Sequence, residues 1–407
     1  MLLFKLGSFF FKIAVYMACF FNQKAKLAVL GRKKVFQILN EFNTANKDSK
    51  IAWFHCASYG EFEQGRPIIE AYRKSFPSNK IVLTFFSPSG YEAWKNYKGA
   101  DLVTYLPFDS NKNARTFLQT LRPDKVFFVK YEFWPNYLEQ LKIMGTSTYL
   151  VSGIFREGQI FFNGSLGKQI LGAFTHFFVQ DSNSKELLAK IGLTNCSVSG
   201  DSRVDRVIQN SQTEFNNDRI ESFCKNQKVI IAGSTWSKDE DLLIEYIRNN
   251  DDWKLVLVPH ELKESKLINL YNKLSGLKYC SYSDTSKSNV INSKILVLDT
   301  MGMLSKVYRF GTICYVGGGF GKGIHNVLEP IIYKKPVIIG PNFKKFKEAR
   351  DLINLGAITS ISDGQELKSA MKLFSDEKAR KKVEASTNIY IDDNKGSVKK
   401  IMDFITK

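Results

Sequence analysis

The stretch IAWFHCASYGEFEQGRPIIEAYRKSFPSNKIVLTFFS, residues 51–87, decides the fold class of this chain. It begins and ends with short runs of apolar, β-branched and aromatic residues, and the segment between them, from Glu63 to Phe76, has helical character. Continuous apolar runs of this length are typical of strands that are buried on both faces. A strand, a helix and a second strand in this order predict parallel strands in a sheet that helices cover.

The same alternation recurs along the rest of the 407 residues, a length that favours two domains. One series of predicted strands ends at residue 200, and a second series begins at residue 228. The predicted strands are 51–58, 80–87, 101–107, 125–131, 147–153, 176–180, 196–200, 228–235, 254–260, 278–283, 294–300, 312–319, 336–340 and 357–362. The polar stretch 203–218 between the two series is interpreted as a linker.

Two such series predict an α/β chain with two Rossmann-like domains that face each other across a cleft. Ligands of such domains bind beyond the carboxyl ends of the strands. The expected domains are residues 36–205 and 206–407, and the stretch 376–407 at the end of the second is interpreted as charged helices.

The N-terminus, residues 1–35, has a different composition. LLFKLGSFFFKIAVYMACFF, residues 2–21, is apolar except for Lys5 and Lys12, and a basic run with Lys24, Lys26, Arg32, Lys33 and Lys34 follows it. This pattern favours a helix that lies in a membrane interface beside a basic patch for anionic lipid. A helix that spans the membrane and a buried N-terminal helix remain as alternatives, and a cleaved signal peptide is disfavoured because no small-residue cleavage site precedes the basic run.

The charge balance narrows the classes of partner. With 58 basic and 40 acidic residues, the formal net charge is +18, which favours an anionic partner, although a merely soluble basic surface is the alternative. No RNA-binding fingerprint is present, so nucleic acid is not expected. The six cysteines are scattered and the four histidines lack metal-ligand spacing, which indicates reduced thiols and no metal site.

Candidate catalytic residues of the first half follow predicted strands. Glu61 and Glu132 each stand where a strand ends and a helix begins, and Arg203 follows a strand near the expected domain junction. A helix N-terminus stabilises a carboxylate as the anion, which suits a general base, while arginine suits phosphate. The alternative for both glutamates is an ordinary acid in the first turn of a helix.

Candidate binding residues of the second half occupy the same places. Ser234 and Thr235 precede a helix expected near Ser237, where backbone N–H groups bind anions, unless they simply cap that helix. Asp239 and Asp241 have the D-x-D spacing of a metal site, but first-turn acids are the ordinary explanation. His260 follows a strand and is either a ligand contact or structural, and Gly302 is expected to open a helix.

The stretch GGGFGKGIHNVLEPIIYKKPVIIGP, residues 317–341, is the most unusual of these. The glycines from Gly317 to Gly319 predict a close approach of the backbone to a ligand. His325, Asn326 and Glu329 are expected in the helix that follows. A glutamate placed there has the chemistry to accept hydrogen bonds from the two hydroxyls of a ribose.

Taken together, these stretches resemble the 3-deoxy-D-manno-octulosonic acid (Kdo) transferases of lipopolysaccharide assembly, which are glycosyltransferases of the GT-B fold. The matching motifs, in chain order, are ASYGE, YEFWPN, VSGIFRE, GDSRVD, AGSTWSKDED, VPHE, DTMGML, GGGFGKGIHNVLEP and PVIIGPNFKKF. They extend over nearly the whole chain. The family commonly has Pro-Arg at 259–260, Met-Gly-Glu at 301–303 and Lys at 203, and this chain departs from it at His260, Met303 and Arg203.

The resemblance implies transfer of Kdo from CMP-Kdo to a lipid A precursor of the lipid IVA type, with inversion and with neither a metal nor another cofactor. Glu61 is implied as the base, and Glu132 and Arg203 as groups that support the transition state. The implied CMP-binding residues are Ser234, Thr235, Pro259, His260, Met301, Gly302, Met303, Gly318, Gly319, Asn326, Val327, Leu328 and Glu329. The expected location is the cytoplasmic face of the inner membrane, with the N-terminus as anchor and an anionic membrane surface as partner.

Two alternatives are retained. One keeps the fold and changes the donor to a UDP-sugar, for a transferase or an epimerase. The other is a non-catalytic basic protein that binds a membrane surface.

Overall fold

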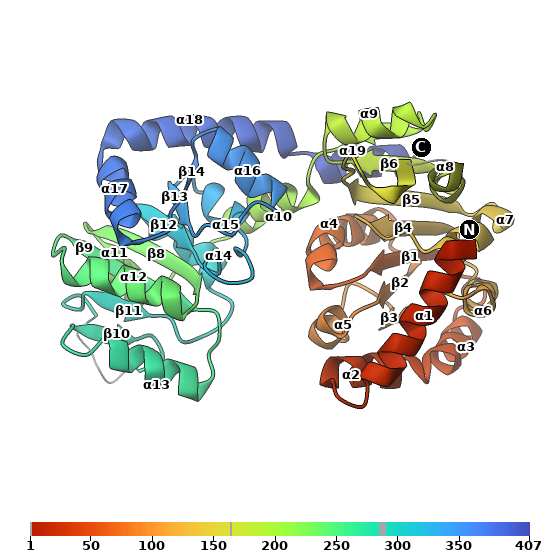
Figure 1. Cartoon of the computed structure of the whole chain (residues 1–407), viewed down its shortest axis with the longest axis horizontal. Coiled ribbons are helices and arrows are strands. Elements are labelled where there is room, and N and C mark those ends of the chain that lie inside the picture. The colour runs from red at the N-terminus through yellow and green to blue at the C-terminus, as the bar shows by residue number, and fades with distance from the viewer. Residues whose placement is uncertain (1, 163–164, 285–289) are drawn as a thin grey trace. The chain divides into compact units, whose positions relative to one another are not determined.

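The computed structural model describes residues 2–162, 165–284 and 290–407, which form two compact units (Figure 1). The N-terminal unit consists of Met1–Asp205 together with Asn394–Lys407, and the C-terminal unit is Arg206–Asp393. The end of the chain, which the sequence analysis assigned to the second domain, therefore belongs to the first.

A parallel seven-stranded sheet forms the centre of the N-terminal unit, in the order β3-β2-β1-β4-β5-β6-β7. All seven strands agree with the sequence prediction. They are β1 (Ile51–Cys56), β2 (Lys80–Phe85), β3 (Leu102–Tyr105), β4 (Lys125–Val129), β5 (Ser147–Gly153), β6 (His176–Val179) and β7 (Cys196–Val198).

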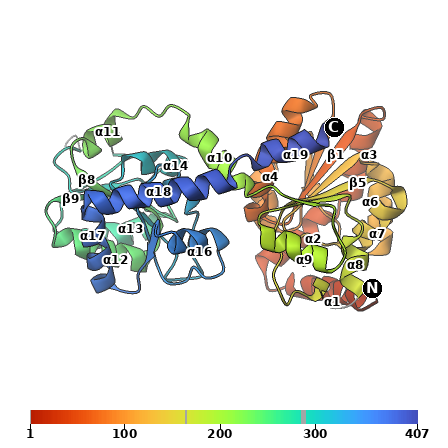
Figure 2. The ribbon, with the colours of Figure 1, turned by 90° about the horizontal axis from the view of Figure 1, so that it is seen from above.

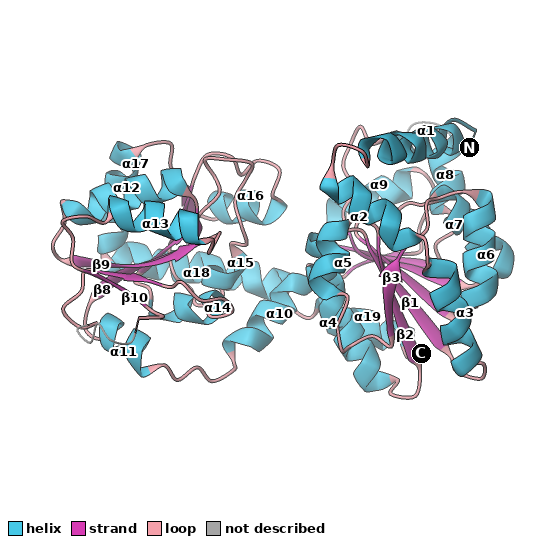
Figure 3. Cartoon of the chain, turned by 90° about the horizontal axis from the view of Figure 1, so that it is seen from below, coloured by secondary structure: helices cyan, strands magenta, loops and turns pink. Residues whose placement is uncertain are grey.

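Helices cover both faces of this sheet (Figure 3). Along β1, Trp53 packs with one face of helices and Phe54 with the other, as the continuous apolar run predicts. One face carries α3 (Val35–Ala45), α6 (Asn111–Leu121), α7 (Pro135–Met144), α8 (Ser165–Leu171) and α9 (Ser182–Lys190). The other carries α4 (Tyr59–Ser75), α5 (Pro88–Trp94) and α19 (Ser397–Ile405).

The C-terminal unit has its own parallel seven-stranded sheet, in the order β10-β11-β9-β8-β12-β13-β14. These strands are also the predicted ones: β8 (Lys228–Thr235), β9 (Trp253–Pro259), β10 (Tyr279–Ser281), β11 (Ile295–Val297), β12 (Ile313–Val316), β13 (Val337–Ile339) and β14 (Ile358–Ser360). Its helices are α11 (Asp218–Cys224), α12 (Ser237–Arg248), α13 (Glu264–Lys273), α14 (Leu304–Val307), α15 (Leu328–Ile331), α16 (Lys347–Asn354), α17 (Gly364–Ser375) and α18 (Glu377–Asn394).

Each sheet reverses its strand order at one place, and ligands of open parallel sheets bind at such points beyond the carboxyl ends of the strands. In the N-terminal unit the reversal lies between β1 and β4, and in the C-terminal unit it lies between β8 and β12. Glu61, Glu132, Ser234 and the glycine-rich stretch from Gly317 lie at or just beyond the carboxyl ends of these four strands.

The predicted linker is largely helical, because α10 (Ser202–Ser211) covers the whole of its first half. A carboxylate in this helix ties the returning chain to the N-terminal unit: Asp205 accepts hydrogen bonds from Gly396 N at 2.6 Å and from Val398 N at 2.7 Å. These bonds satisfy free N–H groups at the start of α19. Ile401 and Ile405 of α19 are then buried beside α4 (Figure 2).

The N-terminal segment forms α1 (Leu2–Ala18) and α2 (Gln23–Arg32). Where the chain is described, no single helix is long and apolar enough to cross a membrane, but Phe10–Ala18 and Gln23–Arg32, bent by 116°, pass this test as a pair. Apolar side chains remain exposed on both helices and on the turn between them, among them Phe10, Phe20 and Phe21. Arg32, expected in the basic patch, is instead buried under α2, so that patch is reduced to its lysines.

Candidate active site

Glu61 lies in the first turn of α4, directly after β1. The helix begins earlier than predicted, at Tyr59, and its N-cap residue Ser58 donates its hydroxyl to Glu61 Oε2 instead of capping the backbone. Glu61 is half-buried, and this burial raises the pKa of its carboxyl group. The negative charge of Glu132 raises it further, whereas Lys130 and the backbone N–H groups of the helix start oppose the rise. Burial thus outweighs the helix N-terminus on which the sequence argument relied.

Glu132 is the centre of a buried hydrogen-bond chain. Its Oε2 lies 3.2 Å from His55 Nε2 and accepts a bond from Trp134 Nε1 at 2.7 Å. His55 is fully buried, and its Nδ1 lies 2.8 Å from Thr84 Oγ1. The tautomer with its proton on Nε2 satisfies both contacts, since Nε2–H then donates to the carboxylate. Sequence analysis missed His55, because a histidine inside an apolar strand shows no polar pattern.

Lys130 is a second residue that sequence analysis missed. It follows β4 directly and has a φ of 72°, a conformation that non-glycine residues rarely adopt. Its positive charge lowers the pKa of Glu61 and also that of Asp201. Strained backbone of this kind is concentrated at functional sites. Lys130 thus supplies positive charge near the carboxylates of Glu61 and Asp201.

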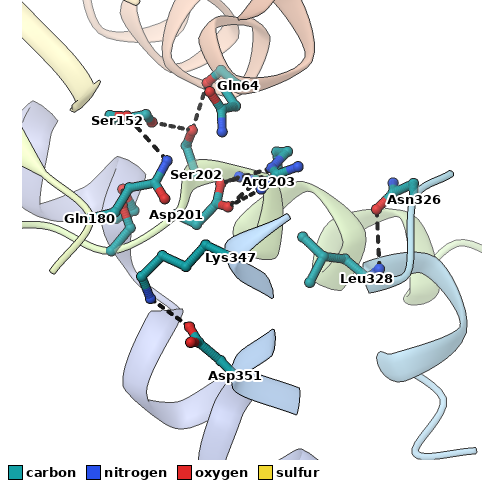
Figure 4. A network of polar contacts seen from close by, with 12 residues as sticks. Gln64, Ser152, Gln180, Asp201, Ser202, Arg203, Asn326, Leu328, Lys347 and Asp351 are labelled. Carbon is teal, nitrogen blue, oxygen red and sulfur yellow. Dashed lines mark hydrogen bonds and ion pairs between the residues drawn. The ribbon is translucent and has the colours of Figure 1, made fainter. Parts of the chain in front are cut away.

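The Asp201 carboxylate holds Arg203 in place. It lies in the first turn of α10, where its Nε and Nη2 donate to Asp201 Oδ2 at 3.0 and 2.6 Å (Figure 4). Burial alone would raise the pKa of Asp201, but the charge and hydrogen bonds of Arg203 hold it below its usual value.

Small polar side chains anchor the start of α10 to the helix that carries Glu61. Ser202 Oγ donates to the carbonyl of Gln64 at 2.6 Å and lies 2.8 Å from Ser152 Oγ (Figure 4). Gln180 donates its amide to the Ser152 carbonyl at 3.1 Å. All four residues are buried, so this network fixes α10 against α4.

In the C-terminal unit, Asp239 is structural. Its Oδ2 accepts hydrogen bonds from Trp236 N at 2.9 Å and Gly318 N at 3.0 Å, and its Oδ1 accepts one from Tyr315 Oη at 2.7 Å. The carboxylate is fully buried and joins the start of α12 to β12 and the glycine-rich loop. Within the described ranges no group of three or more histidine, cysteine or acidic residues has the geometry of a metal site.

Three aromatic rings stack beyond β8 and β9. The His260 ring lies 4.8 Å from the Trp236 ring and 4.3 Å from the His325 ring, between centroids, and Trp236 Nε1 donates to His325 Nε2 at 3.1 Å. Burial lowers the pKa of both histidines, and the neighbouring His260 helps to bring that of His325 to about 4. Both rings are therefore neutral at physiological pH. The hydrogen bond that Trp236 donates to His325 was not predicted from the sequence.

The glycines of the loop after β12 approach other parts of the protein closely. A Cβ atom on Gly319 would lie 2.6 Å from Gly340 Cα, and one on Gly317 would overlap the Ser234 carbonyl oxygen. Gly318 has a φ of 90°. The close approach that the sequence predicts for this loop therefore exists with the protein's own backbone.

His325 and Asn326 precede the helix in which they were expected, since α15 begins at Leu328. Asn326 Oδ1 accepts a hydrogen bond from Leu328 N at 3.1 Å (Figure 4). The amide of Asn326 donates to Glu329 Oε1 at 3.2 Å. The side chain of an asparagine placed in this way favours a turn over a continuing helix. Val327 and Leu328 are buried, so their side chains are not accessible to a ligand.

The other predicted nucleotide-binding residues lie around the same strand ends. Ser234 has a φ of 54°, and Thr235 and Pro259 line a pocket of about 100 Å³ with Lys266 and Lys273. The segment from Met301 to Met303 leads from β11 to α14, with Met301 at 88% exposure. Gly302, which was expected to open the helix, has a φ of 90° and precedes its N-cap residue, Met303.

Comparisons with known proteins find a Kdo transferase domain in the first half of the chain. Residues 32–206 match the family described as 3-deoxy-D-manno-octulosonic-acid transferase (kdotransferase). A 3-deoxy-D-manno-octulosonic acid transferase of Chlamydia trachomatis is 26% identical over 72% of this chain and 70% of its own length. The enzyme of that name from Rickettsia bellii is 22% identical over 93% and 94%. A bifunctional glycosyltransferase/methyltransferase of Fusobacterium nucleatum is 25% identical over 87% of this chain, which spans 57% of that protein.

Solved structures show the fold. A UDP-N-acetylglucosamine 2-epimerase from Neisseria meningitidis has a TM-score of 0.60 at 14% identity, over 88% of this chain and 99% of its own. A similar epimerase from Listeria monocytogenes has the same TM-score at 12% identity, over 88% and 96%. With two parallel Rossmann-like sheets, both are GT-B-like. Residues 32–206 thus form a Kdo transferase domain, and the chain is a glycosyltransferase with a GT-B-like fold.

Proposed function

We propose that this chain transfers Kdo from CMP-Kdo to a hydroxyl group of a lipid A precursor of the lipid IVA type, with inversion at the anomeric carbon. The observation that carries the proposal is the setting of Glu61: a half-buried carboxylate with a raised pKa, beyond the strand end at which the N-terminal sheet reverses. The Kdo transferase domain match over residues 32–206 supports the choice of sugar.

Each step of the transfer has a group in the N-terminal unit. Glu61 takes the proton of the acceptor hydroxyl as its oxygen bonds to the anomeric carbon of Kdo, and the bond from that carbon to the CMP phosphate breaks. A base with a raised pKa binds this proton more strongly than an ordinary glutamate. Arg203, held by Asp201, stabilises the negative charge of the leaving group. Glu132, fixed by His55 and Trp134, keeps the pKa of Glu61 high.

The C-terminal unit would hold the CMP. Ser234 and Thr235 precede α12, whose N-terminal N–H groups favour a phosphate. Pro259 lines the pocket that also contains Lys266, which supplies positive charge beside this helix start. His260 stands where the family commonly has arginine. Because its ring is neutral and stacked on Trp236, we assign it contact with the nucleotide by stacking or hydrogen bonding rather than by charge.

We also propose that the reaction needs no metal. Asp239, the first acid of the D-x-D spacing, uses both carboxylate oxygens for hydrogen bonds within the protein. The CMP leaving group carries a single phosphate, which Arg203 and a helix N-terminus are suited to neutralise.

The location we propose is the cytoplasmic face of the inner membrane. The exposed apolar residues of α1 and the turn after it, with Lys24, Lys26, Lys33 and Lys34 nearby, have the composition of an interfacial anchor. The formal charge of +18 favours an anionic membrane surface.

A product assay tests the proposed reaction. The purified chain is incubated with a lipid IVA-type acceptor and either CMP-Kdo or UDP-N-acetylglucosamine, in the presence and absence of EDTA. The masses of the lipid products are then measured by mass spectrometry. We expect a mass gain of one or more Kdo residues with CMP-Kdo only, unaffected by EDTA. Product from the UDP-sugar alone would favour the alternative donor.

A further inference from the structure

A groove in the N-terminal unit has no part in the mechanism above. It lies between the α1–α2 pair and the loops that follow β2 and β3, and its volume is about 400 Å³, within the range of ligand pockets. Small side chains line it on the helical side, and aromatic rings on the other. The lining includes Ala14, Ala18, Ala25, Ala28, Phe86 and Phe108.

The groove has positive charge as well as apolar walls. Arg32, which is 9% exposed, donates to the carbonyls of Ala28, Phe86 and Leu106 at 2.8, 2.6 and 2.8 Å. Its guanidinium also lies 4.6 Å from the Phe86 ring and 4.4 Å from the Phe108 ring. These partners include no carboxylate. The carbonyl groups therefore stabilise the positive charge of Arg32 without neutralising it. Lys24, which is exposed, adds a second cation to the lining.

One wall of the groove is continuous with the catalytic carboxylates. Phe86 N and Ser87 N donate to the carbonyl of Ala57, the residue before Ser58 and the start of α4. On its other side the Phe86 ring lies 4.6 Å from the ring of Trp134, which donates to Glu132. A molecule in the groove is thus separated from the carboxylate pair by one layer of side chains.

We propose that this groove binds one fatty-acyl chain of the anionic glycolipid acceptor, with Lys24 facing a phosphate of its headgroup. The inference rests on the proposed function. The apolar walls suit a hydrocarbon chain, and the two cations select a lipid with negative charge. The exposed phenylalanines of the adjoining turn, Phe20 and Phe21, place the mouth of the groove beside the surface proposed to meet the membrane. Chain binding here holds the acceptor sugar near Glu61 during transfer.

Filling the groove tests the proposal. Ala25→Trp and, as a second variant, Ala18→Trp place a large ring among the small residues, while Ala45→Trp, at the exposed end of α3, is the control. With the full chain we expect the apparent KM for the acylated acceptor to rise about tenfold or more in the groove variants. The kcat/KM for a deacylated, water-soluble acceptor stays unchanged. An equal loss with both acceptors, or no loss with either, would overturn the proposal.

A binding measurement separates this inference from the proposed reaction. Fluorescent lysophosphatidic acid below its micellar concentration is titrated into each variant without CMP-Kdo, and sedimentation with anionic vesicles is measured in parallel. We expect the groove variants to lose probe affinity about tenfold while vesicle binding is retained. If the wild type transfers no Kdo but the groove variants still lose probe affinity and keep vesicle binding, the proposed reaction is wrong and the groove proposal is supported. If vesicle binding falls together with probe binding, the groove holds bulk membrane lipid and the proposal fails.

Discussion

Lys130 stands with its positive φ between β4 and Glu132, and its charge opposes the rise in the pKa of Glu61. Replacing it with methionine removes that charge at nearly constant length. The pKa of Glu61 then rises further, and because the base must be deprotonated to act, the acidic limb of the kcat/KM–pH profile moves to higher pH.

Lys130→Arg is the matched control for this prediction, since it keeps the charge and is expected to leave the limb where it is. The profile is measured with saturating CMP-Kdo and varied acceptor. An unmoved limb in Lys130→Met would show that Glu61 is not the group whose ionisation limits the reaction.

His325 links the stability of the C-terminal unit to pH. Its pKa of about 4 lies below the 6.5 of an unfolded histidine, so the unfolded chain binds this proton first as the pH falls. The contribution to stability is complete above pH 6.5 and is lost as the pH falls toward 4. We expect the Tm at pH 4.5 to lie a few degrees below that at pH 7.5, and His325→Gln to reduce this difference. An identical difference in the variant would contradict the assignment.

At the scale of one element, α12 depends on a single buried carboxylate. Asp239→Ala leaves Tyr315 Oη and two backbone N–H groups without their acceptor, which we expect to destabilise the C-terminal unit by about 3 kcal/mol. Asp241→Ala is the control, because this acid is exposed and forms an ion pair with Lys273 at 2.8 Å. Its cost is expected to stay below about 1 kcal/mol. Urea unfolding measures both, and equal costs would refute the structural role of Asp239.

Strands were easier to predict than helix boundaries. All fourteen strands were confirmed, because parallel strands that are buried on both faces have continuous runs of apolar residues. The start of α4 was missed because Ser58 and Glu61 interact through their side chains. The spacing of apolar residues gives no sign of such an interaction. The helix expected around His325 was wrong because Asn326 bonds to its own backbone two residues on and delays α15.

The packing of the last helix, α19, could not be predicted from the sequence pattern. Its charged residues concealed an apolar face, and Ile401 is fully buried in the N-terminal unit. We expect Ile401→Ala to destabilise that unit by about 2–4 kcal/mol, as loss of a buried large side chain does. Lys400→Ala, on the exposed side, is expected to change little. Limited proteolysis that cleaves the C-terminal unit first in Ile401→Ala would contradict this assignment.

For the whole molecule, the sequence alone indicated two parallel sheets and placed the candidate residues at strand ends. The observed strand orders supply what it lacked: both sheets reverse beside the strands that carry those residues. His55, whose ring nitrogen lies beside the Glu132 carboxylate, is 77 positions away in the chain and is brought there only by the fold. The return of residues 394–407 to the first unit likewise depends on long-range contacts, since Asp205 binds the start of α19 across 191 positions.

The rate of transfer by Glu61→Gln shows whether Glu61 is the catalytic base. Glutamine keeps the shape of the side chain but cannot take the proton of the acceptor hydroxyl, while Glu63→Gln in the same helix turn is the control. We predict that kcat for Kdo transfer falls by roughly 10²-fold or more in Glu61→Gln, with the affinity for CMP-Kdo unchanged, and stays near the wild-type value in Glu63→Gln. Transfer by Glu61→Gln at the wild-type rate would contradict the account.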